Sequence, residues 1–350
     1  MAFIKASSPH AHQVGNTGTV MLMVLAACIP GILALTVFFG AGVLFNIVLT
    51  SLFCLGFEAA ALKLRNRKLS FYLKDFSAIL TAVLLAIALP PYAPWWLLLC
   101  GAFFAIVVAK QLYGGLGFNP FNPAMIGYIV LLISFPLEMT QWLSPEGFAH
   151  VSIGDGLAQV FSGQALSQID GYTAATPLDV IKQNNTLLLE NIYAQNSLFS
   201  QASWAGLGWE WVNLGFLLGG LFLLYKKVFT WHAPVCMLLA LTILSALFYD
   251  GGSSSSTGSP LLHLFSGGTM LGAFFIITDP VTSSTSNRGR MIYGALAGVL
   301  VFLIRAWGNY PDAIAFAVLL MNFAAPFIDY YTRPRTYGHK KAHIGINKKP

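Results

Sequence analysis

The sequence predicts an all-α integral membrane protein with about ten transmembrane helices, arranged as two inverted five-helix repeats with a periplasmic insert between them. Hydrophobic residues make up 56% of the 350 residues and charged residues only 9%, whereas a soluble domain carries about 25% charged residues. A helix needs about 20 mostly apolar residues to cross the hydrocarbon core. The apolar stretches that predict the helices are 20–38, 41–62, 76–90, 94–112, 120–137, 209–225, 232–249, 261–278, 291–308 and 312–328.

The basic residues predict how these helices cross the membrane. Lysine and arginine collect in cytoplasmic connectors, and most of them here lie at Lys5, 63–74, 226–227, 288–290 and 333–349. Ten spans place all of these on one side, which predicts a multi-pass protein of a bacterial inner membrane with both termini cytoplasmic. The clusters are short and lie at span ends, so they indicate contact with membrane lipid and exclude a nucleic-acid surface. The long first span lacks a cleavage site and is interpreted as an anchor.

Residues 138–208 form the one long interruption of this pattern. The stretch is polar and acidic, and Lys182 is its only lysine or arginine. Loops of this length are usually functional. The interruption divides the chain into a tail 1–19, a first membrane repeat 20–137, the insert 138–208, a second membrane repeat 209–328 and a basic tail 329–350.

The two membrane repeats carry matching features in the same order. In each, a short third span ends at a proline, Pro90 or Pro280, and the next span ends near a basic residue, Lys110 or Arg305. A stretch rich in Gly, Asn or Pro follows. Five spans per half make the halves run in opposite directions, and interrupted spans at matching positions of such repeats indicate a binding site.

The sequence excludes several kinds of redox and nucleotide site. It has no phosphate-binding loop, no dinucleotide glycine fingerprint and no pair of transmembrane histidines for haem. Each of the four cysteines stands alone within an apolar span, so neither iron–sulfur nor zinc ligation is expected and no metal site is predicted. His263, the one histidine well within a span, is interpreted as structural.

A threonine-containing stretch of the insert is a candidate for chemistry. It runs Asp-Gly-Tyr-Thr-Ala-Ala-Thr-Pro-Leu-Asp over 170–179. A threonine hydroxyl is a weak nucleophile that must be activated, and small neighbours let an enzyme's active site close over it. Taken alone, the stretch indicates a turn.

Two further stretches change this interpretation. They are Gly-Gly-Leu-Gly-Phe-Asn-Pro-Phe-Asn-Pro-Ala over 114–124, and Ser-Gly-Gly-Thr-Met-Leu-Gly-Ala-Phe-Phe-Ile-Ile-Thr-Asp-Pro over 266–280. Together with the threonine stretch they resemble the NqrB/RnfD family, whose members are membrane subunits of the sodium-translocating NADH:quinone reductase and of the Rnf electron-transport complex. The resemblance covers essentially the whole chain, and the short N-terminal tail favours the Rnf branch.

The resemblance implies a covalent flavin in the insert. The family carries an [ST]-G-A-T motif whose last threonine is esterified through phosphate to FMN by a separate flavin transferase. The motif here is 173–176, so Thr176 is the implied FMN acceptor and Thr173 begins the motif. Asp170 is a candidate for orienting the donor flavin or a metal in the transferase. Ala174 departs from the common glycine, and because alanine limits positive φ this bears on the efficiency of modification.

The resemblance also implies a second, non-covalent flavin, riboflavin or FMN, in the membrane core. We place it against Asn119, Asn122, Thr269 and Asp279. The alternative is that the glycines and prolines of these stretches only pack and end helices. Asp279 has two interpretations. The favoured one is a cap or salt-bridge partner. The other is a ligand of the coupling ion, because ionisable groups at membrane depth are costly and often functional.

Lys110 and Arg305 leave two interpretations open. Either residue could pair with acidic groups or with a flavin phosphate. Snorkelling of the long side chains to the membrane interface is the favoured interpretation for both.

The predicted function is that of a flavin-carrying membrane subunit that passes electrons within an ion-translocating complex linked to ferredoxin or NAD. No catalytic residue is predicted. The chain is catalytically incomplete alone and needs sister subunits, because nothing in it binds NAD or iron–sulfur clusters. The alternatives are the equivalent quinone-reductase subunit, a secondary transporter or channel, which the interrupted spans fit equally well, and a purely structural scaffold.

Overall fold

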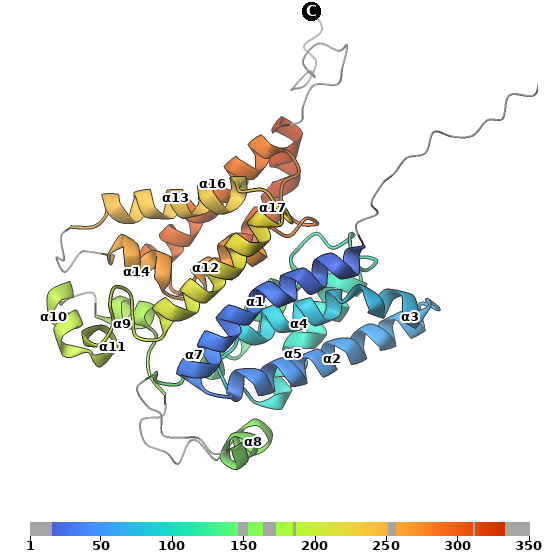
Figure 1. Cartoon of the computed structure of the whole chain (residues 1–350), viewed down its shortest axis with the longest axis horizontal. Coiled ribbons are helices and arrows are strands. Elements are labelled where there is room, and N and C mark those ends of the chain that lie inside the picture. The colour runs from blue at the N-terminus through green and yellow to red at the C-terminus, as the bar shows by residue number, and fades with distance from the viewer. Residues whose placement is uncertain are drawn as a thin grey trace, which may run out of the picture.

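The computed structural model describes residues 16–145, 153–163, 173–184, 187–250, 257–310 and 312–332. Within these residues all regular structure is helical (Figure 1). The β-type pairing among them is limited to an isolated antiparallel bridge between Leu143 and Thr173. The predicted all-α fold is therefore confirmed.

Four of the described helices are long and apolar enough to cross a membrane: α1 (Thr17–Phe39), α2 (Gly42–Leu64), α16 (Asn287–Trp307) and α17 (Ile314–Thr332). A bent pair, Leu69–Asp75 with Ser77–Ala88, makes a fifth span if it is counted as one. The shorter apolar helices are α5 with η2 (Trp95–Gln111), α6 (Pro123–Ser134), α12 (Trp209–Tyr225) and α13 (His232–Leu247). These helices agree with a multi-pass membrane protein, and the count of ten spans stays a prediction.

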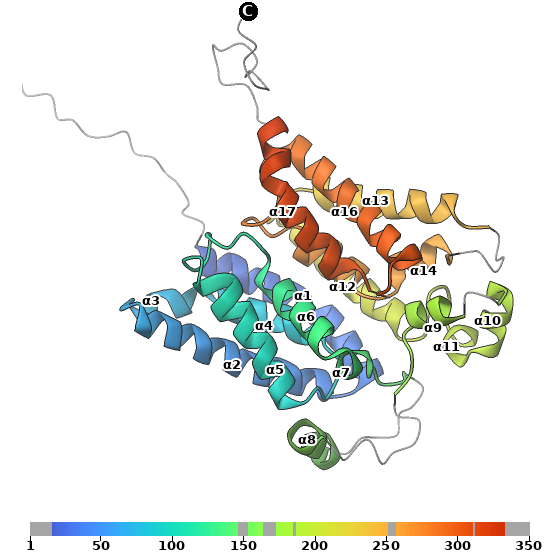
Figure 2. The ribbon, with the colours of Figure 1, turned by 180° about the vertical axis from the view of Figure 1, so that it is seen from behind.

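The helices form two groups that follow the chain. Figures 1 and 2 show α1 to α6 gathered in one group and α12 to α17 in the other. The groups meet where α1 packs along α12 and where α6 packs against α17. Within the second group, α13 and α16 are the closest neighbours. The largest hydrophobic core is continuous across both groups.

Glycines allow the helices of the main contacts to approach closely. A Cβ on Gly219 of α12 would overlap the carbonyl of Ala27 in α1, and one on Gly215 would lie 2.8 Å from the carbonyl oxygen of Pro30. On α16, a Cβ on Gly294 would overlap the carbonyl of Ala233 in α13. Small residues at such crossings let helix backbones touch, which drives helix association in membranes.

The third span of each half is broken. In the first half, α3 (Leu69–Tyr72) and η1 (Leu73–Asp75) precede Phe76, whose φ of 57° turns the chain by 44° into α4 (Ser77–Ala88). In the second half, the expected continuous span 261–278 is wrong. It consists of α14 (Pro260–Phe265), an irregular turn at 266–268, the short α15 (Thr269–Leu271) and the π-helical η4 (Gly272–Ile276). Mean hydropathy misses this break because glycines interrupt a helix without making the stretch polar.

Two other predicted spans differ from the structure in detail. The expected span 94–112 is α-helical only as α5 (Trp95–Phe103) and continues as the π-helical η2 (Phe104–Gln111). The expected span 120–137 begins later, because Asn122 caps α6 at Pro123, and it ends at Ser134 before a second short helix, α7 (Pro136–Thr140).

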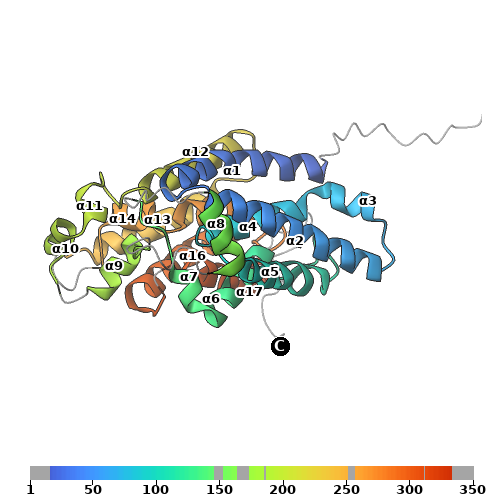
Figure 3. The same cartoon turned by 90° about the horizontal axis from the view of Figure 1, so that it is seen from below.

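The insert contains short helices that lie at one end of the bundle. They are α8 (Ile153–Ser162), α9 (Pro177–Gln183), α10 (Leu189–Gln195) and α11 (Ser197–Ser200). Figure 3 shows α9, α10 and α11 beside α14. Their apolar side chains form a small core of their own that includes Leu178, Leu189 and Leu262 of α14. The segment α9–α11 is thus fixed to the second half of the chain by packing, whereas Val160 of α8 packs against Tyr92 of the first half.

Candidate functional site

Two cavities lie toward opposite ends of the α1–α12 pair. One, which we name the asparagine cavity, has a volume of about 260 Å³ and reaches Val20 near the start of α1 and Leu223 near the end of α12. The other, named the threonine cavity, has a volume of about 330 Å³ and reaches Leu35 and Trp209 at the opposite ends of the same helices. Both are bordered by residues from the two halves of the chain.

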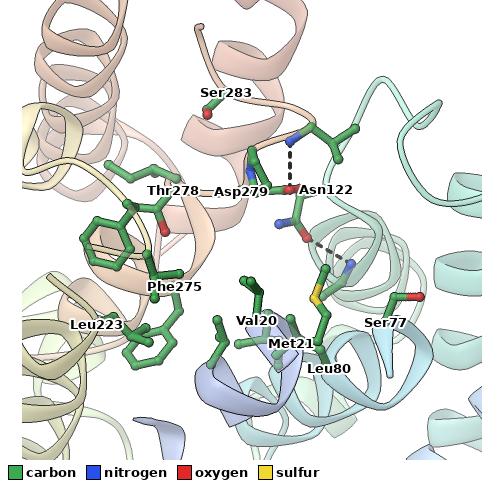
Figure 4. A pocket seen from close by; sticks show the side chains of 18 of the residues that line it. Val20, Met21, Ser77, Leu80, Asn122, Leu223, Phe275, Thr278, Asp279 and Ser283 are labelled. Carbon is green, nitrogen blue, oxygen red and sulfur yellow. Dashed lines mark hydrogen bonds between the residues drawn. The ribbon is translucent and has the colours of Figure 1, made fainter. Parts of the chain in front are cut away.

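Three of the four residues predicted for the membrane core border the asparagine cavity: Asn119, Asn122 and Asp279. Figure 4 shows Asn122 and Asp279 at this cavity, with Leu223 and Phe275 on its apolar wall. Asn122 Oδ1 caps α6 by accepting from the N–H groups of Ala124 and Met125. Asn119 donates to the Phe121 carbonyl at 3.0 Å, but its buried Oδ1 has no hydrogen-bond partner. That oxygen is free to accept a hydrogen bond from a ligand.

Asp279 acts as a local cap. Its Oδ1 accepts from the N–H of Val281 at 3.1 Å and its Oδ2 accepts from the Thr282 hydroxyl at 3.0 Å. Both bonds hold the turn that follows η4. Of the two interpretations of this residue, the geometry matches the cap, and the role of ion ligand stays a prediction.

Thr269 lies apart from the asparagine cavity. Its hydroxyl donates toward the carbonyls of His263 and Ser266 and accepts from Arg305 Nη2 at 2.9 Å. Arg305 also donates to the His263 carbonyl at 2.7 Å and forms an ion pair with Asp312 at 3.3 Å. Arg305 is only 5% exposed, so the prediction that its side chain snorkels to the membrane interface is wrong. The break between α14 and α15 leaves carbonyls that need donors, and the Arg305 guanidinium group supplies them.

Lys110 lies beside the broken span of the first half, as Arg305 does in the second half. Its Nζ lies 2.7 and 2.8 Å from the two carboxylate oxygens of Glu58 on α2, and 2.7 Å from the hydroxyl of Ser77, the first residue of α4. It is 1% exposed. Snorkelling is wrong here too, and pairing with an acidic group, the other interpretation, is confirmed.

Thr176 and Asp179 border the threonine cavity, together with aromatic residues from both halves and from the insert: Tyr128, Trp142, Trp209 and Tyr310. Thr176 is the N-cap of α9 and forms a capping box with Asp179. The Thr176 hydroxyl donates to Asp179 Oδ2 at 2.6 Å, and the same carboxylate oxygen accepts from the Thr176 N–H at 3.2 Å. Both side chains are half-buried. A hydroxyl held against a carboxylate thus lies at the edge of an aromatic-lined cavity.

The rest of the threonine motif pairs with the chain that follows α7. Thr173 is exposed and forms the bridge with Leu143, and the Ala174 N–H donates to the Trp142 carbonyl at 2.9 Å. Ala174 does not have positive φ, so alanine fits this backbone without strain. The predicted Asp170 lies outside the described residues.

Lys182 fixes α9 to the membrane bundle. Its Nζ donates to the Tyr310 carbonyl at 2.8 Å and lies 3.4 and 3.5 Å from the carbonyl oxygens of Ile304 and Arg305, in the last turn of α16. A cation at a helix C-terminus is favoured by the helix dipole. Burial lowers the pKa of this ammonium group, while the nearby Asp179 acts to raise it.

Sequence reasoning missed several of these residues. Asp179 carried a usable signal, because Thr-x-x-Asp before an apolar run has the spacing of a capping box. Glu58 also carried a signal, because it lies within the predicted span 41–62 and ionisable groups at membrane depth are costly and usually paired. Asp312 gave none beyond being a carboxylate at the start of an apolar segment. The aromatic lining of the threonine cavity comes from four separate segments, which no local pattern brings together.

Comparison with known proteins gives one consistent result. The sequence model of the NQR2, RnfD, RnfE family matches residues 4–338. A protein of Cellvibrio japonicus, named as one of the subunits of an ion-translocating oxidoreductase complex, is 60% identical, covering 100% of this chain and 99% of its own. Proteins with the same name from Ectopseudomonas mendocina and Salmonella paratyphi A are 59% and 54% identical over 99% and 97% of this chain, and cover 99% and 100% of their own.

Proposed function

The chain belongs to the NQR2, RnfD, RnfE family, and on that premise we propose that it carries flavins within an ion-translocating electron-transport complex. Its place in an ion-translocating complex rests on the relatives, which share 54–60% identity over nearly the full length and all carry the name of the same subunit of an ion-translocating oxidoreductase complex. The chain is accordingly a multi-pass subunit of a membrane oxidoreductase. It works with other subunits and is catalytically incomplete alone.

Thr176 is the proposed attachment site of FMN, joined through a phosphoester. The observation that carries this proposal is the position of the Thr176 hydroxyl at the edge of the threonine cavity, whose walls include Tyr128, Trp142 and Trp209. A flat aromatic ring fits such walls, since aromatic faces stack favourably. The flavin supplies the redox chemistry when bound, and this chain supplies its position and surroundings.

The asparagine cavity is the proposed site of the second flavin, held without a covalent bond. The unpartnered Asn119 Oδ1 offers an acceptor that matches an N–H group of a flavin ring. Asn122 and Asp279 border the same space. Thr269 instead binds Arg305, whose ion-pair partner Asp312 borders the threonine cavity. We therefore retain Asn119, Asn122 and Asp279 as contacts of the second flavin and assign Thr269 to the buried hydrogen-bond network of Arg305.

A pair of phenylalanines lies between the two cavities. Phe216 borders the threonine cavity and Phe275 borders the asparagine cavity. Their ring centroids are 5.9 Å apart in an edge-to-face contact. This contact joins the linings of the two cavities, which supports a role in passing electrons from one flavin to the other across the membrane core.

The inverted repeat and the orientation belong to the same proposal. Helices with matching positions in the two halves pack on each other, α1 on α12 and α6 on α17. Each half also has a broken third span with a buried cation beside the break, Lys110 or Arg305. We place both termini in the cytoplasm and the insert in the periplasm of a bacterial inner membrane. The exposed apolar side chains of α1 and α2 are assigned to lipid and sister subunits.

Fluorescence of the protein band after denaturing electrophoresis tests the covalent flavin. The chain is co-expressed with a flavin transferase as wild type, as Thr176→Ala and, for a matched control that keeps the motif, as Thr173→Ser. We expect fluorescent bands for wild type and Thr173→Ser and a dark band for Thr176→Ala, in which Thr173 is still present. A dark wild-type band, with a transferase active on another substrate, would overturn the proposal. It would favour a secondary transporter, which the broken spans also fit.

A further inference from the structure

The Thr176 hydroxyl proton points at a carboxylate. The separation of Thr176 Oγ1 from Asp179 Oδ2 is 2.6 Å. Bonds between two neutral oxygens are usually 2.7–2.8 Å long, while an O–H group that donates to a carboxylate lies at about 2.5–2.7 Å. The pair also borders a cavity large enough to admit a ligand. The proton of this hydroxyl is therefore already directed at a group able to accept it.

Esterification at Thr176 requires that proton to leave. A neutral threonine hydroxyl is a weak nucleophile, and enzymes activate such groups with an adjacent base. In phosphoryl transfer by protein kinases, an aspartate accepts the proton of the substrate hydroxyl. A base has to be within hydrogen-bond reach of the proton that it takes, and Asp179 meets this condition within the acceptor protein itself.

We propose that Asp179 is the base that activates Thr176 when the flavin phosphate is attached. The inference rests on the proposed role of Thr176 as the FMN acceptor. Thr176 Oγ1 attacks the flavin-bearing phosphorus of a flavin dinucleotide, the new O–P bond forms, and the phosphoanhydride bond to the nucleotide leaving group breaks. The proton moves from Oγ1 to Asp179 Oδ2 and then to solvent. No electrons are gained or lost.

On the proposed function, the same contact favours Thr176 over Thr173 as the acceptor. Thr173 is three residues earlier and more exposed, yet it forms no hydrogen bond with a described carboxylate. Exposure alone would favour Thr173. Activation by Asp179 favours Thr176.

The experiment compares the rate of flavin attachment in the full chain carrying Asp179, Asp179→Asn or Asp179→Glu. Asparagine keeps an oxygen that accepts from the Thr176 N–H, so it preserves the cap and removes the base. Glutamate restores a carboxylate and is itself a usual capping-box residue. Each protein is supplied with the transferase and excess flavin dinucleotide, and the covalent product is followed by band fluorescence and intact mass.

We expect Asp179→Asn to attach flavin about 10²–10⁴-fold more slowly, the usual contribution of general base catalysis, and Asp179→Glu to recover most of the rate. The ratio of wild-type to Asp179→Asn rates should shrink as the pH rises, because hydroxide replaces the missing base. A ratio that stays constant with pH would assign Asp179 a purely structural role, and equal rates for the two proteins would also overturn the proposal.

The controls separate this inference from the proposed function. If wild type takes no flavin, the role of Thr176 itself fails. If wild type and Asp179→Asn label equally, only the role of Asp179 fails. Should Asp179→Asn not accumulate in membranes, Asp179→Gln takes its place, because glutamine is a usual capping-box residue that differs from glutamate only in lacking the carboxylate. Equal rates for Asp179→Gln and Asp179→Glu would then overturn the proposal.

Discussion

Lys110 and Glu58 form a buried ion pair although 52 residues separate them in the chain. The Lys110 Nζ lies 2.7 and 2.8 Å from the two carboxylate oxygens, and both side chains are almost fully buried. Gln111 donates to the same carboxylate at 3.0 Å. The pair joins α2 to η2 and to the first residue of α4, so the fold of the first half depends on it.

Removal of either partner should destabilise the protein strongly. Glu58→Gln or Lys110→Met leaves one uncompensated charge in an apolar environment, which costs about 3–5 kcal/mol. The double variant Glu58→Gln, Lys110→Met should lose much less, because no charge remains buried. Thermal unfolding in detergent, followed by loss of native fluorescence, measures the difference. A double variant as unstable as the worse single variant would contradict the ion-pair explanation.

Asn119 and Thr269 should differ in their effect on the non-covalent flavin. Asn119→Ala removes the free acceptor at the asparagine cavity, and loss of one hydrogen bond worth about 1 kcal/mol weakens binding several-fold. Thr269→Ser keeps the hydroxyl that binds Arg305 and should leave flavin binding unchanged. Flavin released by denaturing the purified protein, counted separately from the covalent fraction, is the measurement. Full occupancy of the non-covalent flavin in Asn119→Ala would show that the second flavin binds elsewhere.

Lys182→Met should loosen the insert. The Lys182 ammonium group donates to carbonyls at the end of α16, and hydrogen bonds to charged groups are worth about 1.5–3 kcal/mol. Since the group is only partly buried, we expect a loss of stability at the lower end of this range. This loss corresponds to roughly tenfold faster proteolysis within α9–α11. Lys68→Met, which removes an exposed lysine, is the matched control. Equal cleavage of the two variants would show that packing alone holds the insert.

The sequence predicted the elements better than the contacts between them. The expected span 41–62 became α2 (Gly42–Leu64), because a bilayer leaves an apolar stretch few alternatives to a helix. The break at 266–268 was missed, since two glycines hardly alter mean hydropathy. Thr176 was reached through resemblance, and Asp179 lay within a recognisable capping pattern. The partners of Lys110 and Arg305 could not be predicted, because the tertiary fold selects them across broken spans.

Gly219 and Gly56 provide a matched test of the contact between the two halves. Both are helical glycines, but a Cβ on Gly219 would overlap the Ala27 carbonyl, whereas a Cβ on Gly56 has nothing within 4 Å. Gly219→Ala forces α1 and α12 apart, and overpacking of this kind costs about 1–3 kcal/mol. Gly56→Ala should be neutral or stabilising by up to about 1 kcal/mol, because alanine is the better helix former. Thermal unfolding in the same detergent compares them.

If the two variants unfold at the same temperature, close approach at Gly219 does not hold α1 against α12. If only Gly219→Ala is destabilised and it also loses non-covalent flavin, the asparagine cavity depends on this crossing, since α1 and α12 both border it.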